Sequence, residues 1–175
     1  MSVYANNEAN LWLFNKFAVL NLINHSLNQL STTMYKTYET ELRVRPDDID
    51  MFNHVHNSKY FDYVLAARYD QMERCYGLGM EKFMSRGMGW LVRTVYMDYK
   101  RALKMSDYFL VRTRIESIDE KKCKVHFDIL SKATGKTCCD GWFDFVMINM
   151  ATGKGMVIPQ DIIEHYVDSK NCVAE

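Results

Sequence analysis

Residues 45–60 read Arg-Pro-Asp-Asp-Ile-Asp-Met-Phe-Asn-His-Val-His-Asn-Ser-Lys-Tyr, and this is the most densely polar stretch of the chain. Three carboxylates, two imidazoles and two carboxamides lie within it. The segments on both sides are regular, which predicts a loop that joins a strand to a helix. By composition alone, a solvated loop with a helix cap explains the stretch as well as an active site does.

The flanks of this loop predict its two neighbours. Residues 35–45 alternate in polarity and are rich in β-formers, which predicts a strand that ends at Pro46. After the loop, apolar residues recur at helical spacing as far as Gly77, with Asn57 or Ser58 as the expected helix cap.

The rest of the chain predicts an antiparallel sheet. Glycines bracket a short helix at 80–85, and a last helix is expected after Pro159. Between them lie four strand-like runs with turn residues at their joints, 90–99, 108–117, 122–131 and 136–149. We expect these runs to form an antiparallel meander. The fold class is therefore α+β, with one long central helix against about five strands, and its open sheet edge favours a homodimer or homotetramer.

The polar stretch also carries a family pattern. Arg-x-x-Asp-x-Asp-x-x-x-His-Val-x-Asn-x-x-Tyr begins at Arg45, continues to Ala67-Arg68, and resembles the signature of 4-hydroxybenzoyl-CoA thioesterase-like proteins of the hotdog fold. The run from Tyr99 to Asp107 is similar to that family's turn between its second and third strands. The likeness covers about residues 34–167 and implies a hotdog thioesterase domain there, with the sheet wrapped around the helix. A C-terminal tail, 168–175, would follow.

The chain departs from the family pattern at three positions. The family usually has Gly where Asn53 and Ser106 stand, and often Asn where His56 stands. Asparagine tolerates a left-handed backbone better than most residues, so Asn53 is expected to replace its glycine at modest cost. His56 either replaces a structural amide or alters the acyl pocket.

The resemblance implies hydrolysis of an acyl-CoA thioester, with Asp50 as the catalytic carboxylate. A helix N-terminus offers free N–H groups and a positive dipole end to the developing oxyanion. Asp50 would then act as general base for water or as nucleophile. The expected substrate-binding residues open the helix and are His54, His56, Asn57, Ser58 and Tyr60. For Asn57 a helix cap is an equal alternative, and for Tyr60 a core position is favoured.

The phosphates of CoA require cations. Lys121, Lys122 and Lys124 lie at a predicted turn where the resembling thioesterase has its nucleotide-contacting cations. Arg101, in another turn, is a second candidate. A solvated lysine turn explains the same residues at least as well.

Three further polar residues are predicted to be structural. Asp48 is expected to bond backbone or Arg45 rather than take part in the chemistry. Arg68 is expected to form an ion pair, across a dimer or under the sheet. His126 is expected to be a satisfied sheet residue.

Composition excludes several functions. Lys plus Arg and Asp plus Glu number 22 each, so no overall field favours nucleic acid or an anionic membrane. No apolar run is long enough for a transmembrane segment, and the basic start of a secretory signal is missing. A third ligand beside His54 and His56 is lacking, so no metal is expected. Neither a dinucleotide fingerprint nor a P-loop appears, and no organic cofactor is expected. Five cysteines without a C-x-x-C pair predict reduced thiols and a cytoplasmic protein.

Residues 1–33 differ from the remainder in holding only two formal charges, Glu8 and Lys16. Apolar residues at steps of three or four predict an amphipathic N-terminal helix that packs on the folded body, on a partner or on a membrane surface, with the folded body as the expected site. A translation start placed too early is the remaining alternative, because Met34 begins a stretch that reads like a domain opening. Two other functions stay open for the whole chain. One is a non-catalytic hotdog protein that binds acyl-CoA or acyl carrier protein, and the other is a hydroxyacyl dehydratase using His54 or His56.

Overall fold

The computed structural model describes residues 35–167. The predicted N-terminal helix and the C-terminal tail lie outside these residues. The elements in chain order are β1 (Thr37–Arg43), the 3₁₀ helix η1 (Pro46–Asp48), α2 (Asn57–Arg74), α3 (Met80–Ser85), β2 (Met88–Tyr99), β3 (Tyr108–Asp119), β4 (Lys122–Ser131), β5 (Thr137–Asn149) and α4 (Gln160–Val167).

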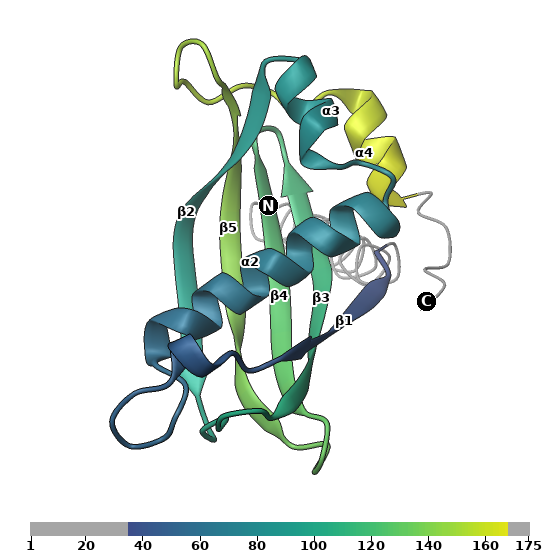
Figure 1. Cartoon of the computed structure of the whole chain (residues 1–175). Coiled ribbons are helices and arrows are strands. Elements are labelled where there is room, and N and C mark those ends of the chain that lie inside the picture. The colour runs from purple at the N-terminus through teal and green to yellow at the C-terminus, as the bar shows by residue number, and fades with distance from the viewer. Residues whose placement is uncertain (1–34, 168–175) are drawn as a thin grey trace, which may run out of the picture. The chain divides into compact units, whose positions relative to one another are not determined.

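The five strands form one antiparallel sheet in the order β1-β3-β4-β5-β2, which confirms the α+β class (Figure 1). The predicted meander of four strands is wrong for β2, which pairs with β5 rather than β3. Between β1 and β2 the chain runs along α2 across the sheet, so β2 joins the edge opposite β1 (Figure 1). Local sequence patterns carry no signal for such a crossing.

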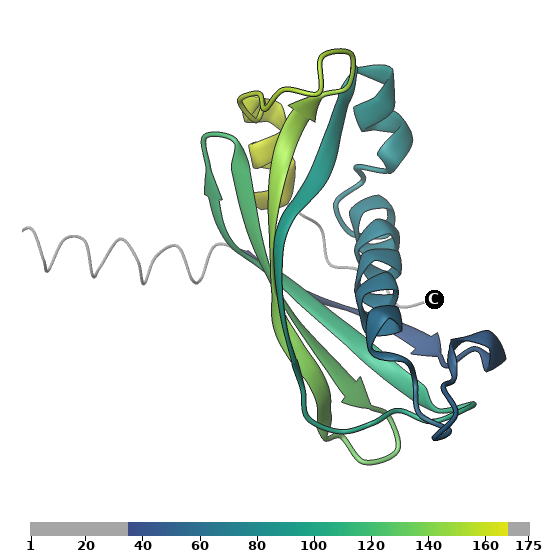
Figure 2. The same cartoon turned by 90° about the vertical axis from the view of Figure 1, so that its left-hand side faces the viewer.

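Helix α2 packs on one face of the curved sheet, and no helix of the described part covers the other face (Figure 2). Alternate residues of β3 point toward α2 and are buried, namely Phe109, Val111, Thr113 and Ile115. This alternation follows from the two-residue period of a strand. Val64 and Ala67 of α2 are fully buried against the sheet. Complete burial of a large apolar side chain contributes about 1.5–3 kcal/mol, so this interface holds the helix in place.

Gly141 lets β2 and β5 approach closely. It pairs with Met97 of β2 and Phe127 of β4. A Cβ atom at this position would lie 1.9 Å from the carbonyl oxygen of Tyr96 and 2.9 Å from Cζ of Phe127. Any larger residue here would push the edge strand β2 away from the sheet.

Cys123, Cys138 and Cys139 are buried free thiols. The prediction of reduced thiols is wrong for Cys75, which is disulfide-bonded. Among residues 35–167, no helix has the length and apolar character needed to cross a membrane.

Candidate active site

The polar stretch forms a closed loop between β1 and α2. An isolated bridge between Ile49 and Val55 joins its two sides. The backbone N–H of Asp50 donates to the His54 carbonyl oxygen at 2.8 Å, and that of Asn53 donates to the Asp50 carbonyl oxygen at 3.1 Å. Asn53 has a φ of 59°, which confirms the expected left-handed backbone.

Asp50 is held by the backbone of its own loop. Its Oδ1 accepts N–H groups from Phe52 at 2.8 Å and from His54 at 3.1 Å. The hydrogen bond from His54, supported by that from Phe52, lowers the pKa of the Asp50 carboxyl. Oδ2 accepts no hydrogen bond from any residue between 35 and 167. The side chain is therefore ionised at neutral pH, half-buried, and has one oxygen available to a ligand.

The N-terminus of α2 offers a donor beside this carboxylate. The helix cap is His56, whose Nδ1 accepts the Ser58 N–H at 3.3 Å, so the prediction of Asn57 or Ser58 as cap is wrong. Imidazole nitrogen replaces the usual oxygen acceptor here, and this role has no strong sequence signal. The N–H of Asn57 meets no acceptor among residues 35–167. The Asn57 carbonyl oxygen accepts the hydroxyl of Tyr99 at 3.0 Å, which ties the helix start to the end of β2.

Asp48 holds the loop in place through its side chain, and the residue is 1% exposed. Its Oδ2 accepts bonds from Arg45 Nε at 2.8 Å and from the Tyr63 hydroxyl at 2.6 Å, and Lys59 Nζ lies 3.3 Å from Oδ1. Burial alone would raise the pKa of this carboxyl, but the bonds from Arg45, Tyr63 and Lys59 outweigh it and lower the pKa to about 2. The predicted structural role of Asp48, bonded to Arg45, is confirmed.

Tyr60 is also a core residue. It is buried, and its hydroxyl accepts the N–H of Leu103 at 3.0 Å. Burial raises the pKa of Tyr60 to about 12, so the phenol stays neutral. Its ring contacts that of Tyr99 edge to face at 5.3 Å. By contrast His54, His56, Asn57 and Ser58 are exposed at the loop and the helix start.

The cationic candidates lie at opposite ends of the sheet. Arg101 lies in the β2–β3 connection, whose Leu103 carbonyl accepts the Val55 N–H of the Asp50 loop at 2.9 Å. Lys121, Lys122 and Lys124 lie at the β3–β4 turn, and Figure 1 shows this turn at the far end of the strands. Lys124 forms an ion pair with Glu116, with 3.3 Å between Nζ and Oε2. Within one chain, the lysine turn and Asp50 are therefore not brought together.

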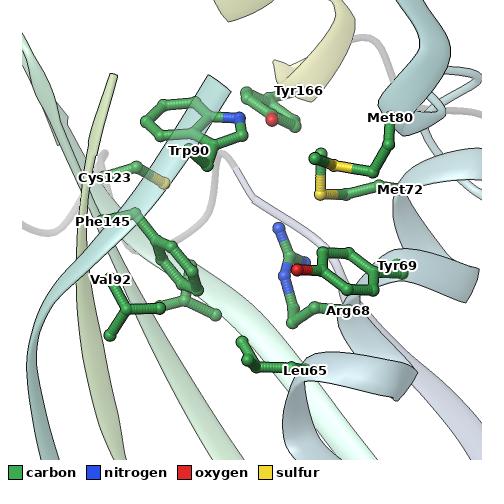
Figure 3. A pocket seen from close by; sticks show the side chains of 11 residues that line it. Leu65, Arg68, Tyr69, Met72, Met80, Trp90, Val92, Cys123, Phe145 and Tyr166 are labelled. Carbon is green, nitrogen blue, oxygen red and sulfur yellow. The ribbon is translucent and has the colours of Figure 1, made fainter. Parts of the chain in front are cut away.

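His126 bonds Glu116, which confirms its role as a satisfied sheet residue. For Arg68, the predicted ion pair under the sheet is not made within residues 35–167, whereas an ion pair across a dimer stays a prediction. Arg68 is buried at 4% exposure, donates to Thr113 Oγ1 at 3.2 Å, and lies over the Tyr76 ring at 5.5 Å, but it pairs with no carboxylate of residues 35–167. The predicted ion pair is absent there because α2 turns Arg68 toward an apolar cavity (Figure 3).

The sequence comparison identifies the family. A family model described as the thioesterase-like superfamily matches residues 44–165. The chain belongs to this superfamily. The long-chain acyl-CoA thioesterase FadM of Escherichia coli is 21% identical over 126 residues, which cover 72% of this chain and 94% of FadM.

Solved structures show the same hotdog fold. A DHNA-CoA thioesterase from Staphylococcus aureus superposes with a TM-score of 0.70 at 19% identity, over 74% of this chain and 88% of that one. A 1,4-dihydroxy-2-naphthoyl-CoA thioesterase from Synechocystis also gives 0.70, at 16% identity over 76% and 97% of the two chains. The fold and the superfamily predicted from the polar stretch are thus confirmed.

Proposed function

We propose that this protein hydrolyses an acyl-CoA thioester to a free acid and CoA, with Asp50 as the catalytic carboxylate. Two groups carry the proposal. One is the ionised, half-buried Asp50, and the other is the Asn57 N–H at the start of α2, which meets no acceptor among residues 35–167. A carboxylate and an oxyanion donor are the two groups that acyl transfer from a thioester requires.

In the proposed reaction, the thioester carbonyl oxygen accepts the Asn57 N–H and the positive end of the α2 dipole. Asp50 Oδ2 then either takes a proton from the attacking water or attacks the carbonyl carbon itself. The carbon–sulfur bond breaks. If water attacks, Asp50 passes the proton it has taken to the CoA thiolate; if Asp50 attacks, water then hydrolyses the acyl–Asp50 anhydride and supplies that proton. His54 and His56 lie close enough to lower the pKa of Asp50 electrostatically, so they help to keep it ionised. No resident metal or organic cofactor takes part in the proposal.

We further propose that two copies pair through β2. This strand is 12 residues long and forms one edge of the sheet, and it exposes Leu91 at 52% and Tyr96 at 54%. A long apolar edge strand favours pairing with another strand. In an antiparallel β2–β2 pair, the end of β2 in one copy lies beside the start of β2 in the other. The start of one α2, tied to Tyr99, then approaches the Trp90 end of its neighbour.

The same pairing supports a divided site for CoA, by which we mean a site with residues from both copies. The β3–β4 turn of one copy, which carries the lysines, then lies toward the Asp50 loop of the other copy. Lys121 and Lys122 from one copy, together with Arg101 beside Asp50 in the other, would then hold the CoA phosphates. The proposed catalytic domain is residues 34–167.

A panel of short, long and aromatic acyl-CoAs tests the proposal, with release of the CoA thiol measured by a thiol-reactive dye. We expect turnover of at least one acyl-CoA above the rate without protein. A protein that binds these esters but releases no thiol would instead be a non-catalytic acyl-CoA-binding member, and dehydration of a hydroxyacyl-CoA would indicate a dehydratase.

A further inference from the structure

A cavity lies between α2 and the β2 half of the sheet, close to α3 and α4 (Figure 3). Most of its wall is apolar and comes from Leu65, Met72, Val92, Val125 and Phe145. Its lining extends from the buried Cys123 to Tyr69, which is half-exposed, so the cavity reaches from the core toward the surface. The cavity volume is about 40 Å³, which is room for the end group of a chain rather than a whole acyl group.

Arg68 is the charged residue of this lining, and Figure 3 shows its guanidinium directed into the space between Tyr166 and Met72. A guanidinium has five N–H donors. Within residues 35–167 the guanidinium donates to Thr113 Oγ1, and the ring and hydroxyl of Tyr76 lie beside it. A buried cation without an anionic partner is strongly destabilising, so a folded protein rarely keeps one without a use.

The groups of residues 35–167 that surround Arg68 supply no negative charge to it. Burial raises the pKa of the Cys123 thiol to about 12, and it raises the pKa of Tyr166 and Tyr76 as well, so all three are neutral at pH 7. Asp70, two residues along α2, is bonded to Arg74 at 2.8 Å and to Thr40 at 2.6 Å. The indole Nε1 of Trp90, in the same lining, is buried beside the Tyr166 hydroxyl, so the polar group nearest to it is neutral as well.

A polar network fixes the position of Arg68. Thr113, which accepts from Arg68, donates in turn to Gln71 Oε1. Gln71 Nε2 donates to Thr40 Oγ1 at 3.1 Å. The network orients the guanidinium but contributes no anion to it. A group that is preformed to bind an anion must be held in position while its own charge stays unneutralised, and the Arg68 guanidinium meets both conditions.

From these contacts we infer that the cavity binds the far end of an acyl group that carries a carboxylate there, and that Arg68 is the residue that recognises it. The inference deepens the proposed function and rests on it for the thioester at the other end of the ligand. The apolar wall would contact the last methylene group, and the guanidinium would form a bidentate, charge-assisted pair with the terminal carboxylate. The preferred substrate class is thus the CoA thioester of a dicarboxylic acid.

The proposed dimer provides a path for such a ligand. The cavity lies beside Trp90 and Val92, at the start of β2, and antiparallel pairing brings the α2 N-terminus of the second copy toward this end. Within one chain, the Phe61 ring near the start of α2 packs on the Phe143 ring of β5 at 5.3 Å, and we take this contact to close the direct route to the cavity. The carboxylate end and the thioester end would therefore be bound by different copies.

The test uses S-alkyl-CoA thioethers, which cannot be hydrolysed, in pairs of equal chain length that end in methyl or in carboxylate. Their dissociation constants with the intact full-length protein are measured by calorimetry. Because no hydrolysis is involved, the result is independent of the role of Asp50. We expect the carboxylate probe to bind at least about tenfold more tightly at one or more lengths, as charged hydrogen bonds of this kind do. Weaker or equal binding of the carboxylate probe at every length would overturn the inference.

Variants assign the preference to Arg68. In Arg68→Met the methyl probe should bind more tightly than the carboxylate probe. The control is Arg112→Met, because Arg112 lies on the outer face of the sheet and pairs with Glu39. This variant should keep the preference for the carboxylate probe. Should Arg68→Met fail to fold, Met72→Glu gives a second test, because a glutamate one helical turn away supplies an internal anion to Arg68. We expect it to abolish the preference and to raise the melting temperature. A carboxylate preference that survives in these variants would exclude Arg68 as its source.

Discussion

Tyr63 donates its hydroxyl to Asp48 Oδ2 at 2.6 Å, and this bond joins the second turn of α2 to the loop that carries Asp50. The Arg45 backbone N–H lies 3.4 Å from the same phenol oxygen. Asp48 also accepts from Arg45 and lies near Lys59, so the loop is fixed at both of its ends. Asp50 is two residues beyond this anchor. Its position beside the α2 N-terminus therefore depends on a carboxylate that has no proposed part in the chemistry.

We expect Asp48→Asn to lower the free energy of unfolding at pH 7 by about 2 kcal/mol, the equivalent of lowering a pKa from 3.8 to about 2. Because the folded-state pKa is the lower one, the stabilisation is present above about pH 4 and is lost as the pH falls toward 2. Urea unfolding of both proteins at pH 7 and pH 3 measures this. The difference should shrink at the lower pH, and a difference independent of pH would contradict the ionic role.

For Asp50→Asn we expect turnover to fall at least about a hundredfold with the fold preserved, as is typical of an essential acid–base group. The rate of CoA thiol release checks this. Asp47→Asn is the matched control, because it removes the same charge from an exposed position in the adjacent turn of η1. If Asp50→Asn turned over like the control, Asp50 would have no place in the mechanism.

Val95→Lys should weaken the proposed dimer, because Val95 is 38% exposed on the edge strand β2 and like charges would meet across a two-fold axis. Light scattering at micromolar concentration should show a dimer for the natural chain and a larger monomer fraction for the variant. Lys36→Met, near the opposite sheet edge, is a control for altered surface charge. A natural chain that is an active monomer would refute both the dimer and the divided site.

Asn53→Val should lower stability by about 1–2 kcal/mol, because a β-branched residue is strained at the φ of 59°. Asn53→Gly should be nearly neutral, since glycine adopts this backbone freely. Thermal unfolding of the two variants gives the comparison. Equal losses from both would show that the asparagine side chain, rather than its backbone, matters at this position.

Much of the local structure follows from the sequence. The short helix at 80–85 and the strand at 122–131 have the predicted bounds. The other strands differ from prediction by one or two residues at one end, or, for β1, by two residues at both ends. Periodicity and turn residues act over a few neighbours, and so a single chain carries this information. The positive φ of Asn53 was predictable for the same reason, because αL is a property of one residue in one turn.

The positions of β2 and of the charged side chains were decided by the tertiary structure. β2 lies beside β5 because α2 crosses the sheet first, and this determines which edge is exposed. Helix spacing placed Arg68 on α2, but whether a carboxylate, a solvent channel or an apolar cavity faces it depends on residues from β2, β4 and β5. The lysine turn and Asp50 are separated for the same reason. The sequence by itself determined the elements and the Asp50 loop, whereas only three-dimensional packing decided which groups face one another, since burial and charge act through space rather than along the chain.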